Sequence, residues 1–94
     1  MILNFENIAN EKVQRIALKL LKGARDCKYQ VNIRSITESI WFVDGKTLEI
    51  IFSKELDAFK FATYCHNFKP SVIEVSNERF MVGLDITGLL NLID

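Results

Sequence analysis

The most reactive side chains in this chain are two cysteines and one histidine. Cys65 and His66 are adjacent, and Cys27 adds a second thiol. A thiol close to an imidazole is typical of nucleophilic catalysis or of a zinc site. Adjacent helical residues point about 100° apart, however, so Cys65 and His66 are poorly placed to act together. The three residues also lack the paired spacing of zinc ligands, so we interpret the thiols as core side chains and the imidazole as a surface group.

The remaining sequence carries no motif of a known reaction. It contains no phosphate-binding P-loop and no dinucleotide-binding, zinc-protease or serine-hydrolase motif, and its carboxylates are scattered rather than paired. With a single histidine, acid–base catalysis would need carboxylates or lysines of strongly shifted pKa, which a sequence pattern does not show. We therefore expect a protein that is not an enzyme and that holds no metal and no cofactor.

The clearest structural pattern is an amphipathic helix from Asn10 to about Arg25. Apolar residues recur every three or four positions from Val13 to Ala24, and Asn7 or Asn10 can cap the start. The opposite face gathers five cations, which are Lys12, Arg15, Lys19, Lys22 and Arg25. Most charged helix faces only keep the surface solvated. Cations at this spacing can also follow the phosphates of a nucleic acid, or face an acidic protein surface.

The charge distribution favours a specific partner over a general polyanion. The chain has no net charge, which argues against a dedicated nucleic-acid binder. Residues 1–34 carry seven basic and three acidic side chains, a balance of +4, and residues 35–94 carry five and nine, a balance of −4. No exposed aromatic residue interleaves with the helical cations, as a binder of single strands would need. The sequence therefore describes a neutral but polarised molecule.

Alternating apolar and polar residues predict strands in the first half of the chain. Tyr29–Arg34 alternates, and Asp44-Gly45 is the turn of a hairpin between Ile40–Val43 and Thr47–Phe52. A two-residue loop would pair Val43 with Lys46 and Trp41 with Leu48. One face of this hairpin would then carry Trp41, Val43, Leu48, Ile50 and Phe52. The other face would carry Ile40, Phe42, Thr47, Glu49 and Ile51.

The second half of the chain predicts a helix, a hairpin and a short closing element. Ser53 can cap a helix from Lys54 to about Phe68, which Pro70 stops. Val72–Ser76 and Arg79–Leu84 then form a hairpin about Asn77-Glu78. Its expected pairs are Val75 with Phe80 and Ile73 with Val82. The apolar tail Thr87–Ile93 is either a short helix or a further strand.

Together these elements predict one α+β domain over residues 1–94. We expect a two-layer sandwich, with a mostly antiparallel sheet of about five strands and two helices on one face. The expected order is α-β-β-β-α-β-β, with a possible short C-terminal helix. Two unpaired cysteines suggest a reducing compartment, and the sequence shows neither a signal-peptide pattern nor an apolar run long enough for a bilayer. We therefore expect a cytoplasmic protein without membrane contact.

The apolar excess of the sequence points to a contact surface. Ile40, Phe42 and Ile51 on one hairpin face, with Leu18 and the tail Leu89–Ile93, exceed what two helices can obviously cover. Either a partner covers them, or a helix or the tail packs over them and makes a three-layer core. Our hypothesis is a small protein that acts by protein–protein contact, as a regulator, inhibitor or assembly component, with a homodimer as one form. Nucleic-acid binding through the basic helix is the alternative, and the Ile-, Asn-, Lys- and Phe-rich composition is typical of phage or mobile-element proteins.

Overall fold

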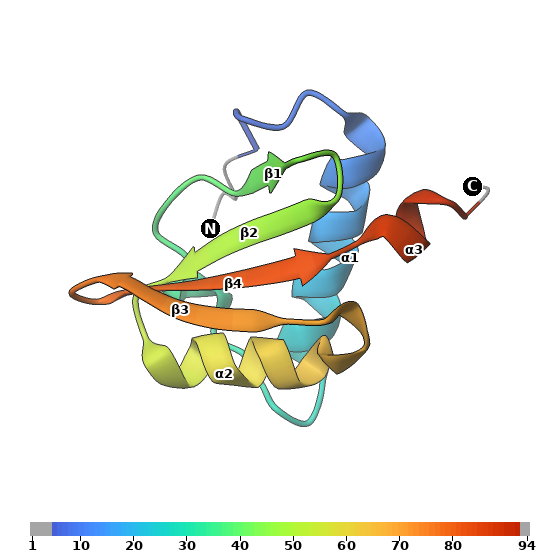
Figure 1. The fold of residues 1–94 in the computed structure, drawn as a ribbon. Coiled ribbons are helices and arrows are strands. Elements are labelled where there is room, and N and C mark those ends of the chain that lie inside the picture. Colours follow the sequence, from blue (N-terminus) through green and yellow to red (C-terminus); the bar gives the residue numbers. More distant parts are fainter. Residues whose placement is uncertain (1–4, 93–94) are drawn as a thin grey trace.

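The computed structural model describes residues 5–92 as an α+β fold (Figure 1). Its helices are α1 (Glu11–Asp26), α2 (Glu55–Tyr64) and α3 (Thr87–Leu90), with 3-10 turns η1 (Ile33–Ser35) and η2 (His66–Phe68). Its strands are β1 (Trp41–Val43), β2 (Thr47–Phe52), β3 (Ser71–Ser76) and β4 (Arg79–Asp85). The strands form one antiparallel sheet in the order β1-β2-β4-β3. The predicted fold class is confirmed, with four strands in the described residues in place of about five.

The segment Tyr29–Arg34 is not a strand, although its sequence alternates. Asn32 caps the η1 turn instead, because its side-chain oxygen accepts a hydrogen bond from the amide of Arg34 (3.1 Å). The carboxylate of Asp57 on α2 accepts from the amide of Asn32 (3.2 Å) and from the hydroxyl of Ser35 (3.0 Å). A buried carboxylate needs such donors, so the segment turns around Asp57 rather than extending along the sheet.

The β1–β2 hairpin turns where the sequence predicts, but its register differs. Asp44 and Gly45 both have positive φ, 55° and 68°, as the turn requires. Val43 pairs with Thr47, so the loop holds a third residue, Lys46. Lys46 instead extends the pairing of β2 with β4, because its carbonyl accepts a hydrogen bond from the amide of Ile86, the residue after β4 (2.9 Å).

This extra loop residue exchanges the two faces of β1. Directly opposite residues on paired strands project to the same face of the sheet. Phe42 is opposite Leu48 and Trp41 is opposite Glu49. The prediction that Trp41 shares a face with Leu48 is therefore wrong, because a shift of one residue moves every side chain of a strand to the other face.

The second hairpin is also shifted by one residue. Its two-residue turn lies where predicted, but β3 contains a bulge at Val75, between Glu74 and Ser76. Beyond the bulge, Ile73 is opposite Met81 and not Val82. The pairs that the structure forms are Val72–Val82, Ile73–Met81 and Glu74–Phe80. The bulge therefore turns Ile73 away from the helices, because one extra residue reverses the alternation.

Two helix boundaries also differ from the prediction. Lys54 and not Ser53 is the N-cap of α2, and no side chain caps that end. Ser53 stays with the strands, since its amide donates to the carbonyl of Ser35 (2.7 Å). At the other end the α-helix stops at Tyr64 and continues as the η2 turn, which ends at Lys69 in a left-handed conformation before Pro70. The predicted cap of α1 by Asn10 is confirmed.

Both long helices pack on one face of the sheet, which we call the inner face. Figure 1 shows α1 crossing behind the strands and α2 running beneath β3. The rings of Phe52 on β2 and Phe61 on α2 lie 5.5 Å apart, centre to centre. The core side chains with at most 1% exposure on these elements are Val13, Ala17, Leu21, Ala24, Leu48, Ile50, Phe52, Ala58, Phe61, Val82 and Leu84. In the described residues, no helix covers the opposite, outer face.

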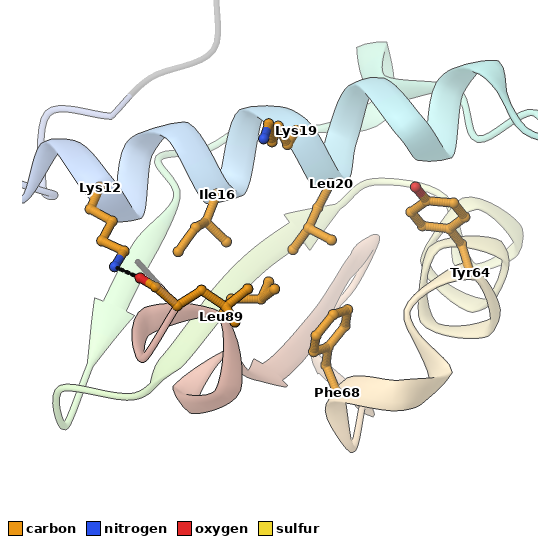
Figure 2. A pocket seen from close by; sticks show the side chains of 8 residues that line it. Lys12, Ile16, Lys19, Leu20, Tyr64, Phe68 and Leu89 are labelled. Atoms are coloured by element: carbon orange, nitrogen blue, oxygen red, sulfur yellow. Dashed lines mark hydrogen bonds between the residues drawn. The ribbon is translucent and has the colours of Figure 1, made fainter. Parts of the chain in front are cut away.

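The two long helices meet closely at Gly23. A Cβ atom at this position would lie 1.9 Å from the hydroxyl oxygen of Tyr64, whose ring reaches from α2 toward α1 (Figure 2). Glycine is usually unfavourable inside a helix. Gly23 is therefore explained by the ring that packs over it.

We expect Tyr64 to decide whether the substitution Gly23→Ala stabilises or destabilises the fold. In the natural chain it should lower the free energy of unfolding by about 1–3 kcal/mol, because the ring must move. In a Tyr64→Ala background the same substitution should be stabilising by about 1 kcal/mol through helix propensity. Urea denaturation of the four proteins measures the coupling, and equal effects in both backgrounds would contradict the proposed contact.

Candidate functional site

The five cations of α1 do not form one uniform stripe. The ammonium group of Lys12 donates to the carbonyl oxygens of Leu90 (2.9 Å) and Leu92 (2.6 Å), so it holds the C-terminal end of α3. The guanidinium of Arg25 binds the carboxylate of Asp26 through two hydrogen bonds (2.9 and 3.2 Å) and holds the pKa of that carboxyl below its usual value. The two ends of the predicted stripe are therefore engaged within the chain.

The three central cations point to different surroundings. Arg15 is exposed and lines a hollow of about 370 Å³ beside Phe5 and Leu18. Lys19 is exposed at the border of a groove on the other side of the helix, and Lys22 is exposed one turn further on. Charge is thus present along α1, but Arg15 and Lys19 line different hollows and Lys22 lines neither of them.

The predicted apolar contact residues also lie in different surroundings. Ile40 is fully buried in the core, and Phe42 is half-buried against it, so neither offers a free surface. Ile51 lies on the outer face but is only 7% exposed. The structure places Ile40 and Phe42 on the side of β1 away from Ile51, because the three-residue loop of the first hairpin turns this side inward. Leu18 is exposed, and Ile93 of the tail lies outside the described residues.

The outer face carries an apolar patch of which the sequence predicted only Ile51 as a contact residue. One row across the sheet consists of Ile51, Met81 and Ile73 on neighbouring strands β2, β4 and β3. Trp41 on β1 lies diagonally beside Ile51 and is 45% exposed, and Ile73 is 50% exposed. We call these four residues the outer patch. Their alternation in the sequence is visible, but which face they occupy depends on the two register shifts.

The centre of the outer face is shaped by Gly83 and Glu49. These residues are opposite each other on β4 and β2, and Trp41 and Ser71 flank them. Gly83 is buried, and a Cβ atom at this position would lie 3.1 Å from the hydroxyl oxygen of Ser71, so the neighbouring side chains already close over the glycine. The partly buried Glu49 lies opposite it on β2.

An ion pair closes one end of the outer face. Arg79 on β4 binds Glu38, which precedes β1, so the pair reaches across the position of β2. One guanidinium nitrogen lies 2.8 Å from a carboxylate oxygen, and a second contact makes the pair bidentate. The guanidinium lowers the pKa of Glu38 from its ordinary value.

On the helical layer, α1, α3 and the end of α2 enclose a groove of about 490 Å³ (Figure 2). Its lining is mainly apolar, from Ile16, Leu20, Phe68, Leu89 and Leu92. Lys12 and Lys19 border it from α1, and Tyr64 lies at its far end. In Figure 2, the side chains of Ile16 and Leu20 point down into the space toward Leu89 and Phe68. We call this space the helical groove.

Cys65 and His66 do not meet as nucleophile and base. The Cys65 thiol is buried, and burial raises its pKa to about 12, so the sulfur stays protonated at neutral pH. His66 is exposed, and its Nδ1 lies 3.2 Å from the carbonyl oxygen of Thr63. Within residues 5–92, no three His, Cys, Asp or Glu residues gather to hold a metal ion.

Comparison of this chain with protein-family models, with curated proteins and with solved structures gives no match. In the described part of the chain, no helix combines the length and apolar character needed to cross a membrane.

The Arg79–Glu38 pair predicts an acid-sensitive contribution to stability. The pKa of Glu38 is lower in the folded chain than its ordinary value of 4.5. The contribution of the ion pair to stability should therefore be complete above a pH of about 4.5. It should disappear as the pH falls through the lowered pKa that Glu38 has in the folded chain. We expect Glu38→Gln to lower the free energy of unfolding at pH 7, with the difference from the natural chain vanishing in acid.

Urea denaturation of both proteins from pH 2 to pH 7 measures this convergence. The matched control is Glu78→Gln, which removes a carboxylate from the loop next to Arg79 and should not reproduce the pH dependence. A difference between Glu38→Gln and the natural chain that is constant over the whole pH range would contradict the ion pair. Because both partners are partly exposed, high salt should also weaken the difference.

Proposed function

We propose that this chain is a small, non-enzymatic binding protein that acts through protein–protein contact, with the outer patch as its contact surface. The observation that carries the proposal is the one-sided cover of the sheet. Both long helices pack on the inner face, while Trp41 and Ile73 stay about half exposed on the other. Contiguous exposed apolar residues on a soluble surface mark contact sites, and tryptophan is enriched among residues that dominate binding energy.

The chemistry of the outer face favours a partner with an apolar and basic surface. Glu49 lies in the middle of the face, opposite Gly83 and beside Trp41. A partner lysine or arginine next to an apolar side chain would complement both features. A second copy that docked by the same face would bring two Glu49 carboxylates toward each other, which is unfavourable. We therefore favour a different protein as partner, and a homodimer is the competing outcome.

The cellular role follows from the same properties. A domain with a contact surface of this kind acts as a regulator, an inhibitor or an assembly component. Cys27 and Cys65 are both free thiols, which supports a reducing, cytoplasmic location. The Ile-, Asn-, Lys- and Phe-rich composition supports a phage or mobile-element origin. None of these points depends on a catalytic group.

We expect Trp41→Ser to weaken partner binding by at least about tenfold, because a large half-exposed aromatic side chain is removed from the contact. Ile73→Ser should act in the same direction, and Glu49→Lys should weaken binding through charge. Candidate partners are captured with the natural chain and with Trp41→Ser, and each is then purified and its Kd measured directly. Circular dichroism checks that all variants are folded.

The matched control is Leu56→Ser, which removes an even more exposed large apolar side chain, at 65%, from α2. It should leave the Kd unchanged. Equal losses for Leu56→Ser and Trp41→Ser, or no loss for either, would overturn the outer patch as the contact surface. Sedimentation equilibrium tests for a homodimer. A concentration-dependent dimer that Trp41→Ser dissociates would show that the partner is a second copy of this chain and not a different protein.

Nucleic-acid binding through α1 is a second proposal, supported by the exposure of Arg15, Lys19 and Lys22 at spacings of three and four residues. The engagement of Lys12 and Arg25 within the chain weighs against it. We expect any such binding to fall steeply with salt, and Lys19→Ala/Lys22→Ala to reduce the slope of log K against log salt by about 2 for duplex DNA. The absence of binding to duplex and single strands at low salt would exclude this function.

A further inference from the structure

The helical groove has the dimensions of a small-molecule site. Its volume of about 490 Å³ lies within the range of about 300–1,000 Å³ that is typical of ligand pockets. Three segments that are far apart in the sequence build it, namely α1, the end of α2 with η2, and α3 (Figure 2). The groove is open to solvent, since Leu92 at its border is 59% exposed.

The lining separates apolar and cationic groups. Ile16, Leu20, Phe68 and Leu89 provide an apolar wall on both sides of the space. The charged groups on this lining are Lys12 and Lys19, both from α1, and none of the described lining residues is acidic. The ammonium of Lys12 already donates to two carbonyl oxygens, and an ammonium has three N–H groups. The groove therefore combines an apolar channel with a positive border.

We infer that the helical groove binds a single alkyl chain with an anionic head group, of the fatty-acid class. The head group lies at Lys19, and the chain lies along Ile16 and Leu20 against Leu89 and Phe68. Lys12 adds positive potential from the α3 side. The lining offers few groups that could recognise a base or a sugar, because apart from the two lysines its one polar side chain is Tyr64.

The length of the groove suits a medium-length chain. On α1 its lining extends from Lys12 to Leu20, which is eight residues or about 12 Å along a helix. This length matches the extended chain of decanoate. The site shares no residue with the outer patch, so this inference stands or falls independently of the proposed contact with a protein.

The test is a titration of the full chain with decanoate, below the concentration at which it forms micelles, followed by calorimetry and by amide chemical shifts. We expect saturable one-to-one binding, with the largest shifts at Ile16, Leu20 and Leu89. Decylamine has the same chain and the opposite charge, and it should bind at least about fivefold more weakly. Equal binding of the two probes, shifts confined to the outer face, or no saturation would overturn the inference.

Two variants place the head group. Lys19→Glu should weaken decanoate binding by about fivefold or more, whereas Lys22→Glu is the matched control with the same change of charge outside the groove. Leu92→Glu adds a carboxylate at an exposed border position and should also weaken binding without unfolding the chain. Thermal unfolding checks that each variant is folded. Equal losses for Lys19→Glu and Lys22→Glu would show that binding follows overall charge, and would reject the site.

Discussion

The structure depends on the place of a single residue, Lys46. In the first hairpin it belongs to the loop, because Val43 pairs with Thr47. For β4, however, it continues the ladder of β2, since its carbonyl accepts a hydrogen bond from the amide of Ile86. A strand side chain alternates between faces, so this one residue decides that the ring of Phe42 enters the core and that the indole of Trp41 is left outside.

The bulge at Val75 has the same effect at the opposite edge of the sheet. It reverses the alternation of β3, so that Val72 turns inward and Ile73 turns outward beside Met81. Two local irregularities, one in the β1–β2 loop and one on the edge strand β3, therefore act on one surface. Between them β2 and β4 run in uninterrupted register over six pairs and supply its centre. The outer patch is contiguous because the two register shifts bring Trp41 on β1 and Ile73 on β3 beside Ile51 and Met81, which pair on the central strands.

The parts of the fold that follow from local physics were predictable, and those that follow from distant contacts were not. The spacing of apolar residues predicts α1, and the dipeptide Asp44-Gly45 predicts the first turn because both residues tolerate the positive φ that they adopt. The hairpin registers were not predictable, because the alternation of the strands marks neither the extra loop residue nor the bulge that sets them. The conformation of residues 29–34 depends on Asp57, and the engagement of Lys12 depends on carbonyl groups 78 and 80 residues away. No local pattern contains such contacts.

The two proposed surfaces lie on opposite layers, and this arrangement gives the neutral chain a direction. The helical layer presents the cations of α1, while the centre of the outer face presents Glu49. The proposed acidic ligand and the proposed basic partner would thus be attracted to different sides, over a distance of about 8–10 Å at physiological salt. The chain passes directly from β4 into α3, and the carboxylate of Asp85 at the end of β4 accepts hydrogen bonds from the amide and the hydroxyl of Thr87. One strand therefore connects both surfaces. The zero net charge of the sequence therefore conceals an uneven distribution, with a balance of +4 in residues 1–34 and of −4 in residues 35–94.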